Sequence, residues 1–200
     1  MHIARLVKGM DADSIADLRV SAMILLAFSG FLRFNELVNL KLEDLNILTT
    51  YMVLNITSSK TDQFRKGHLV HIARTGSPCC PVVLMERYLA KAEFQINDKG
   101  YVFRNFSYKK GSVVLQDNDK KMTYTRVREI VKQKFMSIGL DTQCYTLHSL
   151  RSGGASAAAR NNVPDRLFQR HGRWRTESIK NSYVEESTNN LLLVSQNLGL

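Results

Sequence analysis

The sequence has few cysteines and no long apolar run. Its three cysteines, Cys79, Cys80 and Cys144, are an odd number, and no Cys-x-x-Cys or Cys/His spacing typical of a metal site occurs. We therefore expect reduced thiols in an intracellular protein rather than a disulfide framework. The longest apolar stretch, around AMILLAF, is too short to span a bilayer, and MHIARLVKGMDAD contains no apolar run of signal-peptide length. Internal repeats and low-complexity segments are also absent from the sequence.

Acidic residues are in short supply relative to basic ones. The 200 residues include 28 Lys and Arg against 18 Asp and Glu, which gives a net charge of +10. Such a balance does not indicate a fold, but it favours a polyanionic partner such as nucleic acid. A basic surface that only aids solubility is the alternative. The length suits one domain or one domain plus a short extension, and a hydrophobic fraction of 44% is sufficient for its core.

The spacing of apolar residues predicts a mainly helical α+β protein with one small sheet. Residues 51–57 and 68–73 are rich in strand formers and flank a polar turn, which predicts a β-hairpin with a basic tip. Gly, Asn, Asp and Lys clusters make 97–120 mostly loop. We expect helices at 13–30, 33–40, 81–94, 123–139, 148–160, a short one after Pro164, and two more at 176–184 and 187–198.

The stretch HSLRSGGASAAAR places two functional side-chain types on one helical face. His148 and Arg151 are three residues apart, and the Ser, Gly and Ala residues that follow allow close packing around the arginine. A partly buried arginine needs an anion, and its planar fork matches two phosphate oxygens. Arg33 has a similar relation to Glu36, although an exposed ion pair explains that spacing equally well. Taken alone, each pattern is too short to indicate a function.

Five elements taken in order are more specific than any of them alone. They are the arginine in GFLRFNEL, a lysine in SSKTDQFRKG, then HSLR, HGRW, and a tyrosine nine residues after that tryptophan. In this order the sequence resembles the tyrosine recombinases, also called the phage integrase family. The wording of SKTDQFRKG and RHGRWRTESIKNSYV is most similar to recombinases of DIRS- and Crypton-type eukaryotic mobile elements. The resemblance covers residues from about 15 to 185.

The resemblance implies an α+β, mainly helical catalytic domain whose small antiparallel sheet carries the lysine on a β-hairpin. It implies an enzyme that cleaves and rejoins DNA strands through a 3′-phosphotyrosyl intermediate, with no metal, ATP or other cofactor. The implied partner is double-stranded DNA, on which the family assembles as a homo-oligomer, a tetrameric synapse. Neither a membrane nor a small-molecule substrate is implied, and the likeness to eukaryotic elements implies a nuclear location.

The family's catalytic positions can be carried over residue by residue. Trp174 stands where most members have a second histidine and some have tryptophan. The fixed step to the nucleophile leads from Trp174 to Tyr183, whereas the same step from His171 leads to Lys180. The resemblance thus assigns six catalytic residues: Arg33, Lys60, His148, Arg151, Trp174 and Tyr183.

Further charged residues are expected around these six. Glu36 fits the acidic position that supports the first arginine, and Lys66 shares the turn with Lys60, so the choice of catalytic lysine stays open. His68, His71 and His171 are expected to cap, pack or contact phosphate. The residues expected to contact DNA are Lys66, Lys109, Lys110, Lys120, Lys121, Arg173 and Arg175.

The reaction explains why these residue types are needed. A tyrosine can form a phosphotyrosyl ester that conserves the energy of the broken phosphodiester. Two arginines, an imidazole and the Trp174 N–H are donors for the charge that develops on the phosphate oxygens. His148 suits the general base that takes the phenol proton, and Lys60 suits the general acid that protonates the departing 5′-oxygen.

The expected organisation is a single catalytic domain over residues 1–200, with 1–12 as a linker remnant and 185–200 as a tail helix. Relatives usually carry a separate N-terminal DNA-binding domain, which we expect to be absent here. A domesticated, inactive DNA-binding module or a truncated gene product is therefore an alternative, although the complete set of six residues argues against a decayed site. A type IB topoisomerase shares the chemistry, but the Trp-to-Tyr spacing favours a recombinase. The tail is equally suited to docking on its own subunit or on a neighbour.

Overall fold

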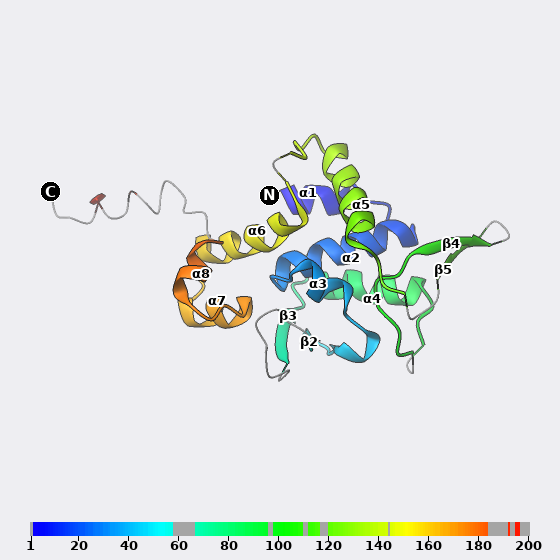
Figure 1. The fold of residues 1–200 in the computed structure, drawn as a ribbon, viewed down its shortest axis with the longest axis horizontal. Helices are drawn as coiled ribbons and strands as arrows, with labels where there is room; N and C mark the ends of the chain where they lie inside the picture. Colours follow the sequence, from blue (N-terminus) through cyan, green and yellow to red (C-terminus); the bar gives the residue numbers. More distant parts are fainter. Residues whose placement is uncertain are drawn as a thin grey trace.

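The computed structural model of the protein describes residues 2–57, 67–95, 98–109, 112–116, 120–143, 145–183, 192 and 195–196. Helices form most of the regular structure in these ranges, and two small antiparallel sheets complete it (Figure 1). The predicted α+β, mainly helical class is confirmed. No helix in the described ranges is both long and apolar enough to cross a membrane.

Helix α2 (Ile15–Ser29) is the centre of the fold. It is buried without interruption from Leu18 to Ala27, because its apolar residues face every direction rather than one stripe. It packs against α4 (Pro81–Lys91) on one side and α6 (Leu147–Arg160) on another, as Figure 1 shows. Ser14 caps its first turn by accepting the Asp17 N–H. Gly30 ends the helix and begins the turn that carries the site.

Two further helices cover the core. Helix α5 (Tyr124–Ser137) buries the stripe formed by Val127, Val131 and Phe135 and is capped by Thr123. We expected residues 1–12 to be a linker remnant, but His2–Lys8 form helix α1, with Leu6 and Val7 buried in the core. Burial of these two side chains makes α1 part of the packed domain. Seven residues are too few for an apolar period to stand out in the sequence.

The predicted hairpin is part of a three-stranded antiparallel sheet. Strands β1 (Leu45–Ile47), β2 (Tyr51–Ile56) and β3 (His68–Ala73) are in that order, and Leu54 of β2 is paired with both Leu45 and Val70. Alternate residues of β2 point into the core, as the period of two requires. Strand β1 was not predicted, because three residues cannot establish an alternation. Residues 58–66 connect β2 to β3 and lie outside the described residues.

A second hairpin lies in the segment that we predicted to be mostly loop. Strands β4 (Phe106–Lys109) and β5 (Ser112–Leu115) pair antiparallel, with Phe106 opposite Leu115. In Figure 1 this hairpin extends from the end of the molecule opposite to α7 and α8. The Gly, Asn, Asp and Lys residues around the hairpin favour loop, and its two strands of four residues each are too short to change that prediction. The prediction for 97–120 was mostly loop, and it did not include this hairpin.

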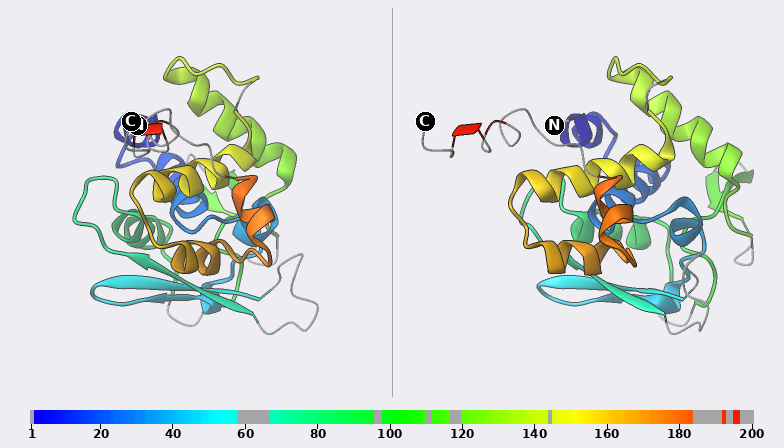
Figure 2. Two further views of the ribbon diagram at one scale, coloured as in Figure 1. Left: turned by 90° about the vertical axis from the view of Figure 1, so that its left-hand side faces the viewer. Right: turned by 60° about the vertical axis from the view of Figure 1, so that its left-hand side comes forward.

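The C-terminal helices and the turn after α2 enclose a second apolar cluster. Helices α7 (Asp165–Gly172) and α8 (Glu177–Asn181) follow α6, while α3 (Phe34–Val38) and the short 3₁₀-helix η1 (Leu42–Asp44) follow α2 (Figure 2). Phe31, Ala155, Phe168 and Trp174 form the cluster, and Tyr183 packs against it. Lys180 pairs with Asp165 at 2.8 Å and so ties α8 to α7. Most of the expected tail helix at 185–200 lies outside the described residues.

Close packing of α6 on the end of α2 depends on Gly154. A Cβ built there would lie 2.1 Å from the Phe28 carbonyl oxygen and 2.9 Å from the Phe31 ring. We expect Gly154→Ala to destabilise the fold by about 1–3 kcal/mol, because two helices must move apart. Gly153→Ala is the matched control, since its Cβ would meet only the Phe28 ring, at 3.5 Å. It should be neutral or stabilising by about 0.5–1 kcal/mol. Denaturant unfolding measures both, and equal midpoints for the two variants would contradict this packing.

Candidate active site

The turn between α2 and α3 supplies the first pair of charged groups. Phe31 has a left-handed backbone (φ 46°), which turns the chain sharply after Gly30. Arg33 is the N-cap residue of α3; its backbone N–H donates to Glu36 Oε2 at 2.8 Å, and its Nη1 donates to Oε1 at 2.7 Å. Burial alone would raise the pKa of the Glu36 carboxyl, but the charge of Arg173 and the contacts with Arg33 hold it below its ordinary value. Glu36 is therefore an ionised support for the arginines.

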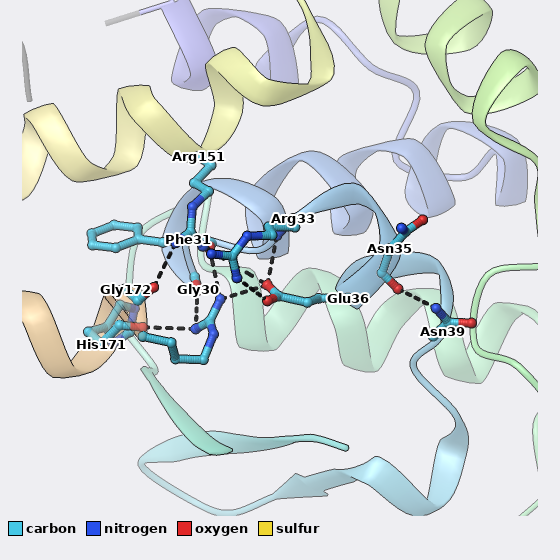
Figure 3. A network of polar contacts seen from close by, with 10 residues as sticks. Gly30, Phe31, Arg33, Asn35, Glu36, Asn39, Arg151, His171 and Gly172 are labelled. Carbon is cyan, nitrogen blue, oxygen red and sulfur yellow. Dashed lines mark hydrogen bonds and ion pairs between the residues drawn. The ribbon is translucent and has the colours of Figure 1, made fainter. Parts of the chain in front are cut away.

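Helix α6 places Arg151 against this turn. Its side chain is 0% exposed, Nη2 donates to the Gly172 carbonyl at 2.6 Å, and Nη1 donates to the Phe31 carbonyl (Figure 3). Burial, followed by the charges of Arg33 and Arg173, lowers the pKa of this guanidinium to about 10. It therefore keeps its charge at neutral pH. Each amino group retains a second hydrogen for an anion.

His148 lies one turn before Arg151 and is exposed. Its ring centroid is 5.0 Å from that of Tyr183. Partial burial, followed by the charges of Arg151 and Arg33, lowers the pKa of His148 below its ordinary value. The imidazole is therefore neutral near pH 7, which is the state that can accept a proton.

Trp174 and Tyr183 complete the group of side chains. Their rings are 5.5 Å apart, and the Arg151 guanidinium carbon lies 4.9 Å from the Trp174 ring and 5.1 Å from the Tyr183 ring. The Trp174 Nε1–H is buried and has no hydrogen-bond partner among the described residues. An indole N–H without a partner costs free energy unless a ligand accepts from it. The site therefore has a donor that suits an anionic oxygen.

Arg173 departs from our prediction. We expected it on a DNA-contacting surface, but it is 6% exposed. Its Nη2 donates to Glu36 Oε2 at 2.8 Å and to the Phe31 carbonyl at 2.8 Å, which draws the guanidinium inward. Burial lowers the pKa of Arg173 against the opposing pull of Glu36. This burial argues against the predicted DNA contact, and the sequence gives no sign that Glu36 lies beside Arg173.

The predicted basic surface is described in part. Lys120, Lys121 and Arg175 are exposed, and Lys121 Nζ donates to Asn39 Oδ1 at 2.6 Å. Lys109 is the last residue of β4. Lys60, Lys66 and Lys110 lie outside the described residues. The choice between Lys60 and Lys66 thus stays open, and the roles of all these residues stay predictions.

The structure adds two residues that the sequence did not single out for the site. The Phe31 carbonyl accepts from two arginines, and the Gly172 carbonyl accepts from one of them. A Cβ at Gly172 would lie 1.9–2.4 Å from carbon atoms of the Trp174 ring, so only glycine fits there. His171 Nε2 donates to the Ser29 carbonyl at 2.7 Å, and burial lowers its pKa, so it is a packing residue. Backbone acceptors leave no signal in a sequence, although the glycine two residues before the HGRW tryptophan is a weak one.

Comparison with known proteins identifies the family of the chain. A family model described as the phage integrase family matches residues 2–190. The chain belongs to the phage integrase family. An integrase/recombinase XerD homolog from Selenomonas ruminantium is 30% identical to it over 179 residues, which cover 88% of this chain and 50% of the relative. The chain thus spans half the length of that relative.

Solved structures of integrase-family recombinases share the fold. XerH site-specific recombinase, in a post-cleavage complex with palindromic difH substrate, has a TM-score of 0.73 at 17% identity over 98% of this chain and 49% of its own. XerA recombinase has a TM-score of 0.67 at 20% identity over 99% of this chain and 61% of its own. The Tn1549 transposon integrase, in complex with transposon right-end DNA, has a TM-score of 0.56 at 15% identity over 90% of this chain and 58% of its own.

These likenesses confirm the predicted fold, that of the tyrosine-recombinase catalytic domain. The integrase-family chain brings Arg33, His148, Arg151, Trp174 and Tyr183 together in one place, with Glu36 behind them. Their individual catalytic roles stay predictions. The matches do not bear on the finer resemblance to DIRS- and Crypton-type elements or on a nuclear location, which also stay predictions.

Proposed function

We propose that this chain is the catalytic domain of a site-specific DNA recombinase or integrase. It cleaves and rejoins DNA strands through a 3′-phosphotyrosyl intermediate, and its own side chains supply the acid–base and electrostatic chemistry. The observation that carries the proposal is the position of Tyr183. Tyr183 lies next to a neutral imidazole, a buried arginine and an indole N–H that has no partner among the described residues, and these surroundings support a role as the nucleophile.

The proposed reaction exchanges one phosphoester for another. The Tyr183 oxygen attacks the scissile phosphorus, the bond from phosphorus to the 5′-oxygen breaks, and a 3′-phosphotyrosine forms. His148 takes the phenol proton, and Lys60 gives a proton to the departing 5′-oxygen. Religation reverses each transfer, so no oxidant, reductant or nucleotide is consumed.

The transition state needs donors for its non-bridging oxygens. Arg33 is the more open of the two proposed phosphate-binding arginines, with a side chain 22% exposed, while Arg151 is a fully buried charge. The Trp174 Nε1–H offers a neutral donor. Donors that are fixed before the substrate arrives avoid reorganisation during the reaction. Arg151 in particular is held in place by two carbonyls.

Duplex DNA is the proposed partner. XerH was solved with its difH substrate and the Tn1549 integrase with transposon DNA, and both share this fold. The net charge of +10 supports the same partner. Lys120, Lys121 and Arg175 are exposed cations suited to backbone phosphates. Assembly as a homo-oligomer on DNA is part of the proposal and rests on family membership.

Covalent capture tests the proposed function. Duplexes with randomised cores and a nick beside the cleavage point lose the 5′-terminated fragment after cleavage, so that religation cannot occur. We expect the chain to form a protein–DNA adduct in excess EDTA without ATP, visible by denaturing electrophoresis. Absence of an adduct, together with retained duplex binding, would instead support the alternative of an inactive DNA-binding module.

The pH dependence of adduct formation follows from His148. Its pKa lies below the ordinary value, so the base is neutral across the neutral range and becomes protonated only in acid. We expect the rate to be flat near pH 7 and to fall about tenfold per pH unit below the His148 pKa. Single-turnover rates from pH 4.5 to 8 measure this, and His148→Ala should be slow with no acidic limb. An unchanged acidic limb in that variant would assign the base to another residue.

A further inference from the structure

Arg173 directs all of its terminal amino hydrogens into the protein. Nη1 donates to the carbonyls of Gly30 (3.1 Å) and His171 (2.8 Å), and Nη2 donates to the carbonyl of Phe31 and to Glu36 Oε2, both at 2.8 Å. These four bonds use the four hydrogens that the two amino groups carry. Arg173 therefore has no terminal N–H left for a phosphate, and any role in the reaction must be exerted through its neighbours.

The backbone of Arg173 is in a conformation that favours glycine. It caps α7 with φ 56° and ψ 36°, the left-handed region in which helix C-caps usually have glycine. If only this left-handed backbone conformation mattered at residue 173, glycine would adopt it at lower cost than arginine. Such strain persists where surrounding contacts over-determine it, and here those contacts are the four inward hydrogen bonds. The side chain is thus the reason for an arginine at this position.

Glu36 lies between two buried cations. Its Oε2 is 2.8 Å from Arg173 Nη2 and 4.0 Å from Arg151 Nη1, while its Oε1 is paired with Arg33. Without Arg173, Glu36 Oε2 loses its guanidinium donor and keeps only the Arg33 backbone N–H among the contacts described above, while Arg151 Nη1 is 4.0 Å away. The attraction at such distances is strong in a poorly solvated site, so the carboxylate should turn toward Arg151. That contact would neutralise the charge that Arg151 offers to a phosphate.

We propose that Arg173 is a positioning residue that keeps Glu36 away from Arg151. The same side chain ties the end of α7, and with it Trp174, to the turn after α2 through the Gly30 and Phe31 carbonyls. It acts on the reaction by holding Glu36 Oε2 at 4.0 Å from Arg151 Nη1, so that the carboxylate compensates the charge of Arg151 only in part. This inference rests on the proposed function for its kinetic consequence, but its structural consequence can be measured without DNA.

The structural arm of the test is a crystal structure of Arg173→Gln. We expect Glu36 Oε2 to move from 4.0 Å to hydrogen-bonding distance of Arg151, about 2.8 Å. A carboxylate that stays at its original distance overturns the proposal, whether or not the chain cleaves DNA. Arg173→Gly, which suits a φ of 56°, replaces the Gln variant if that one does not fold.

The kinetic arm uses single-turnover adduct formation. Arg173→Gln should slow it by at least about tenfold, since misplaced catalytic groups commonly cost up to about a hundredfold, while duplex affinity stays unchanged. Arg166→Gln removes a charge from the exposed part of the same helix and is the matched control.

Adding Glu36→Gln to Arg173→Gln should restore part of the rate, because a neutral amide does not compete for Arg151. A merely structural role predicts a further loss instead, and that result overturns the proposal. A wild-type chain without an adduct contradicts the proposed function alone, because the crystallographic arm still decides the role of Arg173.

Discussion

Tyr183→Phe should form no covalent adduct with nicked duplex, while its affinity for DNA stays close to that of the unchanged chain. The phenol oxygen is the proposed attacking atom, so its removal leaves nothing to bond to phosphorus. The ring remains, and with it the packing against Trp174 and His148. One hydroxyl also contributes little to an electrostatic footprint that spans many phosphates. Denaturing electrophoresis measures the adduct, and binding titrations at several salt concentrations measure affinity.

Tyr145→Phe is the matched control for this result. Its ring packs against Phe135 beside α5, remote from the arginine cluster in the contacts that it makes. The control should form adduct at the normal rate. An adduct in the Tyr183→Phe reaction would show that another residue is the nucleophile, and peptide mapping of the adduct would identify it.

Arg151→Lys is expected to have the second large effect, on both rate and stability. A lysine keeps the charge but cannot donate to two carbonyls and a phosphate in the planar arrangement of a guanidinium. Loss of one preorganised donor costs about 10²- to 10³-fold in rate. The Gly172 carbonyl, which Arg151 Nη2 contacts at 2.6 Å, would lose this partner, at a cost of about 1–3 kcal/mol.

Arg160→Lys provides the comparison for that variant. Arg160 is the exposed last residue of the same helix, so the same chemical change there tests the helix without the site. We expect normal adduct formation and an unchanged denaturation midpoint. If Arg151→Lys cleaves as fast as Arg160→Lys, the fork geometry of Arg151 is not required and the proposed donor set is wrong.

Long helices could be predicted from the sequence because their buried faces require apolar or small residues at regular intervals. Helices α2, α5 and α6 each repeat apolar or small residues over fourteen or fifteen positions, and the structure places them within a few residues of the predicted bounds. Strand β1 and helix α1 are too short to repeat anything. The β4–β5 hairpin lies among polar residues that indicate loop. The secondary structure of β1, α1 and the β4–β5 hairpin therefore depends on tertiary contacts rather than on a local sequence pattern.

The sequence indicated which residues belong to the candidate site, but not how they are arranged in space. The order of arginine, hairpin lysine, His-x-x-Arg, tryptophan and tyrosine indicated its members, because five elements in sequence are specific. No spacing reveals that Arg173 turns inward to Glu36, since these residues are far apart in the chain and meet only through the turn after α2. The Phe31 and Gly172 carbonyls are likewise invisible to sequence, because every residue carries one.

The contact between the Trp174 ring and Gly172 couples the residue types that can occur at these two positions. A Cβ at residue 172 would lie 1.9–2.4 Å from carbon atoms of that indole, so a chain with tryptophan can tolerate only glycine there. The atoms concerned belong to the six-membered ring of the indole, so an imidazole in place of Trp174 would remove this constraint. The two positions should therefore covary among homologous sequences, with the tryptophan lineage fixed at glycine and the histidine lineage more varied. Engineers who exchange the ring between lineages would have to change both residues, and the order of the two substitutions would decide whether the intermediate folds.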